Sequence, residues 1–91
     1  MGLLFEWDRK KAKRNFVKHK INFEEATTIF GDPNSIIIKD TIHSIDEERF
    51  IIIGRSIKNK LLVAVHCERQ DRIRIINARK ATHRERRTYE E

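Results

Sequence analysis

The residues best suited to chemistry in this chain are a histidine, a glutamate and several arginines near the ends of strand-like runs. His66 and Glu68 alternate along one apolar run, and Arg72 and Arg74 alternate along the next. Because side chains switch face at every residue of a strand, each pair projects from a single face. Pairing of the strands can therefore bring one set onto or near a single open sheet surface: Arg55, His66, Glu68, Arg72 and Arg74.

Such a cluster is suited to cleaving an RNA phosphodiester through its own 2′-hydroxyl, a route that needs no metal. His66 or Glu68 would accept the 2′-hydroxyl proton as general base. The arginine forks would stabilise the charge that gathers on the phosphate. His66 or His83 would protonate the leaving 5′-oxygen. The same residues also suit a non-catalytic module that only docks nucleic acid or a protein partner, and that alternative stays open.

Other chemistries are excluded by missing partners. The His66-x-Glu68 pair lacks the paired cysteines of a zinc deaminase. The three glycines form no phosphate-binding loop. Cys67 alternates with Val63 and Val65, so we expect its thiol to point into the core rather than act as a nucleophile. We therefore expect neither a metal nor a cofactor.

Capping and turn signals define the elements in the first third of the chain. Residues 3–6 are apolar enough for a short strand. Asp8 suits the N-cap of a helix that buries Phe16, because Asp oxygens accept hydrogen bonds from first-turn amides. Asn22 suits the N-cap of a second helix, and Gly31 is expected to end it as the C′ residue.

The rest of the chain predicts a sheet followed by a helix. Four β-branched runs have strand length, at residues 36–39, 49–56, 61–67 and 72–78. Short links join the last three, which predicts an antiparallel meander with the first run at an edge. Thr82 and Glu85 form a capping box that opens a C-terminal helix. The fold class is α+β: a small single domain, residues 1–91, with two N-terminal helices packed on an antiparallel β-sheet and a short C-terminal helix.

The charge distribution indicates a polyanionic or acidic partner. The chain has 91 residues with 38% hydrophobic and 37% charged residues and a net charge of +6. Residues 9–20 carry seven Lys or Arg and no acid, and residues 69–91 carry eight against four acids. If these two ends meet in space, they form a positive surface suited to phosphate. No apolar run is long enough for a membrane helix and no signal peptide is present, so we expect a cytoplasmic protein without membrane contact.

Nearly the whole chain resembles the BrnT family of bacterial toxins, in the stretches FEWDRKKAKRNFVKHKINFEEATTIFGDP, HSIDEERFIIIGRS and RIRIINARKATHRERRTYEE. The resemblance implies a RelE-like fold and a ribonuclease that halts growth by cutting RNA. It also implies a BrnA-like antitoxin that carries a DNA-binding ribbon-helix-helix region. Contact with operator DNA would then come only through the toxin–antitoxin complex.

The resemblance also concentrates the expected roles on particular residues. Toxins of this fold work with basic residues plus an acid or a histidine, without a metal. Tyr89 is comparable with a C-terminal tyrosine of some RelE-like relatives, although its place on a terminal helix favours a packing or partner role. We expect catalysis from Arg55, His66, Glu68, Arg74 and Arg79, and RNA binding from Arg49, Arg72, Lys80, Lys18 and His19.

Overall fold

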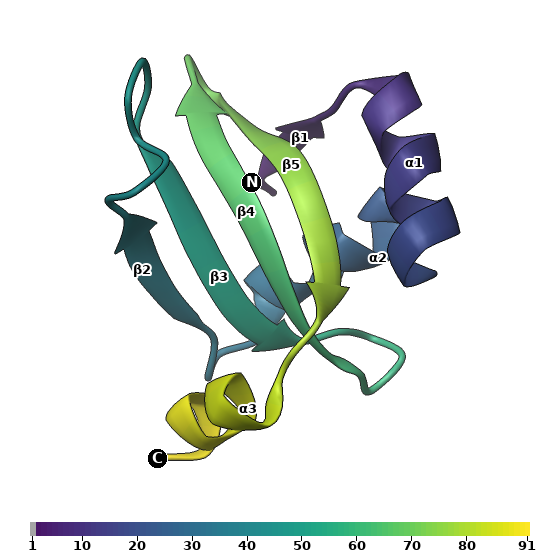
Figure 1. Cartoon of the computed structure of the whole chain (residues 1–91), viewed down its shortest axis with the longest axis vertical. Helices are drawn as coiled ribbons and strands as arrows, with labels where there is room; N and C mark the ends of the chain where they lie inside the picture. The colour runs from purple at the N-terminus through teal and green to yellow at the C-terminus, as the bar shows by residue number, and fades with distance from the viewer. Residues whose placement is uncertain (1) are drawn as a thin grey trace.

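A five-stranded mixed sheet with three α-helices makes up the fold (Figure 1). The computed structural model describes residues 2–91. The expected α+β class is confirmed. The elements follow one another as β1 (Leu4–Glu6), α1 (Arg9–His19), α2 (Phe23–Thr27), the 3-10 helix η1 (Thr28–Gly31), β2 (Ile36–Asp40), β3 (Arg49–Arg55), β4 (Leu61–Arg69), β5 (Arg72–Lys80) and α3 (His83–Glu90).

The strand order confirms the predicted meander and corrects the predicted sheet type. The strands lie in the order β1-β5-β4-β3-β2, and β2 to β5 pair antiparallel with β2 at an edge. β1 pairs parallel with β5, so the expectation of a purely antiparallel sheet is wrong. The chain between β1 and β5 includes two α-helices, the 3-10 helix η1 and three strands, which gives ample length for a parallel connection.

The predicted N-caps Asp8 and Asn22 are confirmed, whereas the predicted C-terminal cap at Gly31 is wrong. The Asp8 side chain accepts hydrogen bonds from first-turn amides of α1, and Asn22 Oδ1 accepts one from the Glu25 amide at 2.7 Å. Gly31 ends η1 rather than α2, and no glycine among residues 2–91 has a positive φ, so Gly31 is no left-handed C′ residue. No helix in this part of the chain is long and apolar enough to cross a lipid bilayer.

The main core lies between the sheet and the segment of α1, α2 and η1. Phe23 and Ile29 from the helical segment are fully buried against Ile52 of β3 and Ile75 of β5. Phe16 was expected to join this core but is 47% exposed. The inner side of α1 instead carries the buried Asn15 and the partly buried Ala12.

A second, smaller cluster covers the opposite face of the sheet. Ile53, Leu61 and Val63 are buried there under Ala81 and Tyr89, at the end where α3 lies (Figure 1). Both faces of β4 are therefore apolar over most of its length.

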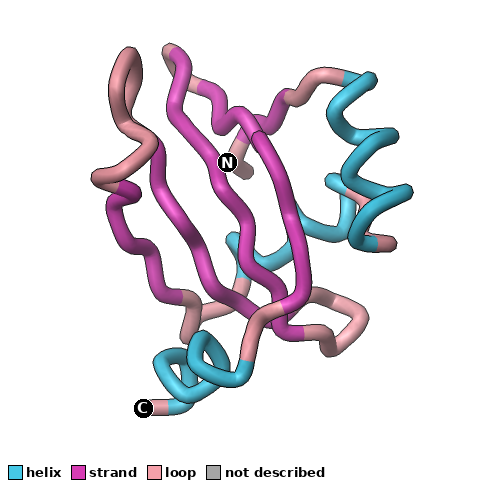
Figure 2. The backbone as a smooth tube through the Cα atoms, viewed as in Figure 1, coloured by secondary structure: helices cyan, strands magenta, loops and turns pink. Residues whose placement is uncertain are grey.

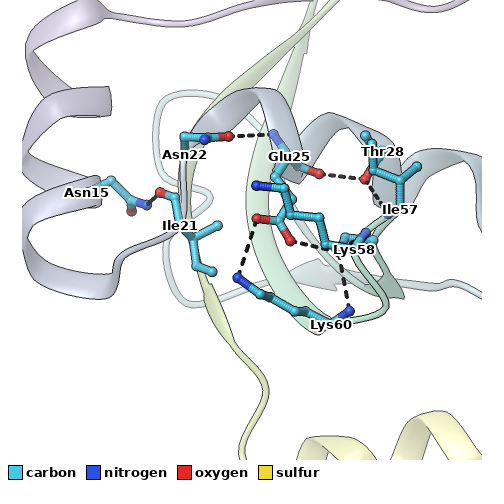
Figure 3. Close-up of polar contacts among 9 residues, drawn as sticks. Asn15, Ile21, Asn22, Glu25, Thr28, Ile57, Lys58 and Lys60 are labelled. Atoms are coloured by element: carbon cyan, nitrogen blue, oxygen red, sulfur yellow. Dashed lines mark hydrogen bonds and ion pairs between the residues drawn. The ribbon is translucent and has the colours of Figure 1, made fainter.

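A buried carboxylate joins α2 to the turn between β3 and β4 (Figure 3). Glu25 is 5% exposed, and its Oε2 accepts a 2.7 Å hydrogen bond from Ser56 Oγ. The Lys60 ammonium lies 3.9 Å from Glu25 Oε1. Ser56 Oγ in turn accepts from the amides of Lys58 and Lys60. This network fixes the helical segment to the hairpin that ends β3.

Candidate functional site

Five arginines share one face of the sheet, which we call the arginine face. Arg49 of β3 and Arg74 of β5 both lie opposite Cys67 of β4, and residues directly opposite one another project from the same face. The other three also lie opposite odd-numbered residues of β4. The arginine face comprises Arg49, Arg55, Arg72, Arg74 and Arg79. The expectation that Arg55, Arg72 and Arg74 would share one sheet surface is confirmed, and Arg49 and Arg79 lie on the same face.

The arginine face is extended rather than focused on one point. Arg49 and Arg55 stand at opposite ends of β3, roughly 20 Å apart at the rise of an ordinary strand. Arg72 and Arg74 lie toward the Arg49 end, and Arg79 lies toward the Arg55 end beside α3. The five guanidinium groups therefore cannot surround a single phosphate, and their arrangement suits a strand of several linked phosphates.

Two of these arginines are held by carboxylates. Arg79 donates to both carboxylate oxygens of Glu85, at 2.7 and 2.8 Å, and Arg74 donates to Glu6 at 3.0 Å. The hydrogen bonds from Arg79 lower the pKa of Glu85 to about 2, so this carboxylate is a weak proton acceptor. Within residues 2–91, three guanidinium groups of the face form no ion pair: Arg49, Arg55 and Arg72. Of these, Arg55 donates from Nη1 to the backbone O and the Oδ1 of Asn59, each at 3.4 Å.

Tyr89 connects α3 to the far end of the arginine face. Its hydroxyl donates a 2.6 Å hydrogen bond to Asp32 Oδ2, and the same oxygen accepts from the Arg55 amide at 2.8 Å. The Arg55 guanidinium lies 5.8 Å from the centre of the Tyr89 ring. The hydrogen bond to Asp32 raises the pKa of Tyr89 above its ordinary value. These contacts give Tyr89 the packing role that its helix position favours.

His66 is buried in the main core, so its expected place on the open surface is wrong. It is 4% exposed and lies opposite Phe50 and Ile75, on the face that packs against the helical segment. Its ring meets Phe30 edge-on at 4.9 Å and stacks on Phe50 at 5.7 Å. Its Nδ1 has no hydrogen-bond partner, and burial lowers the pKa of His66 to about 4. A neutral ring enclosed in this way does not meet a substrate.

Glu68 and Lys80 also project away from the arginine face. Glu68 lies opposite Ile73 and Lys80 lies opposite Leu62, and both charged side chains are exposed. Even-numbered residues of β4 share the face of His66, which explains why Glu68 is separated from the arginines. The expectation that His66 and Glu68 would share a surface with the arginines is therefore wrong. Both faces of β4 are apolar over most of its length, so the alternation of side chains could not show which face the helices cover.

A histidine that the sequence reasoning did not select lies beside Arg49. Asp40, the last residue of β2, is opposite Arg49, and its Oδ2 is 2.9 Å from His43 Nδ1. The Asp40 side chain is 10% exposed and that of His43 is 66% exposed. Burial raises the pKa of Asp40, but the hydrogen bonds from the His43 ring and backbone outweigh it and hold that pKa below its usual value. Asp40 thus stays charged and orients an accessible imidazole.

His43 and Arg49 line a common hollow at the end of the sheet. Its volume is about 290 Å³, and its other lining residues are Ile45, Asp46 and Glu47. Figure 2 shows the connection between β2 and β3 rising from this end of the sheet. In the sequence, only the Asp-x-x-His spacing of Asp40 and His43 indicates that these two side chains can pair. Their position beside Arg49 depends on the register of β2 with β3.

The strand registers align one residue from every strand in a row across the arginine face. The row is Asp40, Arg49, Cys67, Arg74 and Glu6, from β2 to β1. Cations and carboxylates therefore stand on neighbouring strands about 5 Å apart. Such a row can hold a phosphate and move a proton beside it. Within residues 2–91, no three His, Cys, Asp or Glu side chains are grouped as metal ligands would be.

The expected RNA-binding residues Lys18 and His19 line a separate hollow of about 450 Å³ between α1 and β5. Arg79 of the arginine face lines it as well. The structure thus brings these helix residues next to one member of the arginine face, although they lie far from Arg79 in the sequence.

Comparisons with known proteins agree with the resemblance in the sequence. Residues 7–85 match the family model described as ribonuclease toxin, BrnT, of type II toxin-antitoxin system. The 1.1 Å crystal structure of the Brucella abortus ribonuclease toxin, BrnT, is similar, with a TM-score of 0.69 and 16% sequence identity. The match covers 90% of this chain and 100% of that one, and at this identity it bears on the fold. No curated protein matches the chain significantly.

Proposed function

Because this chain belongs to the BrnT family of ribonuclease toxins of type II toxin–antitoxin systems, we propose that it cuts RNA at the row that crosses the arginine face. Its substrate is RNA and its partner is an antitoxin, as the family implies. One observation supports this position of the site most directly. His43, oriented by Asp40, shares a hollow with Arg49, whose guanidinium has no acidic partner within residues 2–91.

His43 is the proton acceptor in this proposal. When its Nδ1–H is donated to Asp40, Nε2 keeps a free lone pair that can take the proton of a 2′-hydroxyl. The 2′-oxygen then attacks phosphorus and the bond to the 5′-oxygen breaks. The leaving oxygen takes a proton from water, and the resulting hydroxide takes the proton held by His43. The products are a 2′,3′-cyclic phosphate and a 5′-hydroxyl end. Glu85 is the weaker candidate, because Arg79 lowers its pKa to about 2.

The arginines supply the positive charge that this route requires. Charge builds up on the phosphate oxygens in the transition state, and fixed guanidinium donors stabilise it most where water is partly excluded. Arg49 and Arg74 flank Cys67 in the middle of the row and would hold the reacting phosphate. Arg55, Arg72 and Arg79 would hold neighbouring phosphates of the strand. In this proposal no metal takes part.

The remaining expectations follow from the family and stay proposals. Residues 1–91 would act as one BrnT-like toxin domain with a RelE-like arrangement of the N-terminal helices on the sheet, working in the cytoplasm where RNA is translated. The antitoxin would be BrnA-like, with a ribbon-helix-helix region through which the complex binds operator DNA. Co-purification with the antitoxin, followed by an operator gel shift with toxin alone and with the complex, tests this part.

A growth assay tests the proposed site. Arg49→Gln with Arg74→Gln should abolish the growth arrest caused by induced toxin, because both changes remove charge beside the reacting phosphate. Arg84→Gln with Arg87→Gln, on the exposed side of α3, removes the same charge and should leave arrest intact. Circular dichroism would confirm that both variants fold. Arrest by a folded Arg49, Arg74 variant as strong as by the unaltered protein would refute this placement of the site.

A further inference from the structure

The hollow between α1 and β5 forms because β1 pairs with only part of β5. β1 covers β5 only along Arg72–Arg74, so the second half of β5 has a free edge beside α1 (Figure 1). Asn15 fills the gap: its amide donates to Ala78 O at 2.8 Å, and its oxygen accepts from the Ala78 amide at 3.0 Å. These hydrogen bonds hold α1 at a fixed distance from the edge of β5. The hollow between them stays open, and we call it the groove.

Only basic and neutral residues line this groove. Lys11, Arg14 and Lys18 of α1 recur at helical spacing and face the groove, with His19 beside them. Asn77 and Arg79 line the strand side, and no Asp or Glu lines the groove. Within residues 2–91, Lys11, Arg14 and Lys18 form no ion pair. Their charge is therefore available to an anion from outside the chain.

The groove is continuous with the arginine face. Arg79 lies on that face opposite Val63, and it also lines the groove. Asn77 lies opposite Val65 and is exposed on the same face. A polyanion that leaves the arginine face at the edge of β5 therefore meets the groove next.

We propose that this groove binds the sugar–phosphate backbone of the RNA strand outside the cleavage point. The inference rests on the proposed function, because the strand is taken to run from the Arg49 row across the arginine face. Lys11, Arg14 and Lys18 pair with phosphates, while His19 and Asn77 offer hydrogen bonds to 2′-hydroxyls or base edges. A single strand fits better than a duplex, because the ligand must enter a hollow of about 450 Å³ beside a strand edge.

Binding of an RNA that cannot be cut tests this groove separately from catalysis. The probe is a fluorescently labelled single-stranded RNA of about fifteen nucleotides with 2′-O-methyl groups, followed by anisotropy. Arg14→Gln with Lys18→Gln should weaken binding by about tenfold or more. The slope of log affinity against log salt should become shallower by about 1.4, the value for two lost phosphate contacts on a single strand. Lys10→Gln with Lys13→Gln removes the same charge from residues of α1 that do not line the groove, and should change the affinity less than about threefold.

Two results would contradict the proposal that the groove binds RNA. One is equal weakening in both double variants, which would show general attraction to a basic helix. The other is undiminished binding in the Arg14, Lys18 variant. Failure of the proposed function has a different signature, since unmodified RNA would then remain intact with the unaltered protein while the anisotropy results still report on the groove.

Discussion

The carboxamide of Asn15 pairs with both backbone groups of Ala78, donating at 2.8 Å and accepting at 3.0 Å across 63 residues of chain. It also donates to Ile21 O at 2.9 Å, and Asn15 as a whole residue is 7% exposed. One helix side chain thus replaces the neighbouring strand that β5 lacks at this point. The same contact sets the width of the groove that we assign to RNA.

Removing this side chain should destabilise the protein strongly. Asn15→Ala leaves the amide and carbonyl of Ala78 and the carbonyl of Ile21 without their partner in a buried place. Unsatisfied buried polar groups cost about 1–3 kcal/mol each before relaxation, so we expect the free energy of unfolding to fall by about 2–4 kcal/mol. Urea denaturation measures it. Asn34→Ala, at an exposed turn, should cost less than about 0.5 kcal/mol, and similar losses in both variants would count against the structural role of Asn15.

His66 should make stability depend on pH. Its pKa is lowered to about 4 in the folded protein by burial, against about 6.5 unfolded, so the unfolded chain binds more protons between these values. Stability is therefore unaffected by His66 above about pH 6.5 and falls as the pH drops toward 4. The loss by pH 4 is about 3 kcal/mol relative to His66→Leu, which cannot titrate. Parallel urea titrations of the two proteins from pH 7 to pH 4 would show this, and parallel curves would contradict it.

The ion pair between Arg79 and Glu85 should stabilise α3 in a pH-dependent way. The pKa of Glu85 is lowered to about 2 by Arg79, so the contribution is present above the unfolded value near 4.5 and is lost as the pH falls toward 2. Because the pair is partly exposed, we expect Glu85→Gln to cost only about 1 kcal/mol at pH 7. Thermal unfolding of the two proteins should show a clearly smaller difference at pH 2 than at pH 7. Glu90→Gln, at the exposed end of α3, serves as the control.

Tyr89 allows its contact with Asp32 to be measured directly, because it is the only tyrosine in the chain. The hydrogen bond to Asp32 raises its pKa above the ordinary value of 10, with burial adding to the effect. Absorbance of the phenolate against pH should therefore give a midpoint above 10. Asp32→Asn should move that midpoint back toward 10. An unchanged midpoint would show that the Asp32 carboxylate is not next to the Tyr89 hydroxyl.

Local signals in the sequence predicted most elements of this fold. Asn22 and Thr82 cap their helices as expected, since capping depends only on residues within one turn. The strands of the meander were found because β-branched runs separated by short turns leave few other arrangements. The parallel pairing of β1 was missed, because a three-residue strand gives no signal of its distant partner.

The site was predictable in composition but not in position. Arg55, Arg72 and Arg74 were expected on one sheet surface, and they do share one face. Arg79, five residues after Arg74, reaches the same face because the pairing of β4 with β5 is irregular between Val65 and His66. His66 was misplaced because Leu62 and Leu61 make both faces of β4 apolar, so the pattern could not show which face lies inside. His43 was missed because its value depends on the register that brings Asp40 opposite Arg49.

The central claim is that the row at Arg49 cuts RNA with His43 as the proton acceptor and without a metal. Purified toxin, freed from antitoxin, would be incubated with end-labelled single-stranded RNA in excess EDTA, beside its His43→Gln variant, and the products resolved on a denaturing gel. We expect fragments with 2′,3′-cyclic or 3′-phosphate ends from the unaltered protein and at least a hundredfold slower cleavage from the variant. Equal cleavage by both proteins, or cleavage that EDTA abolishes, would contradict the account.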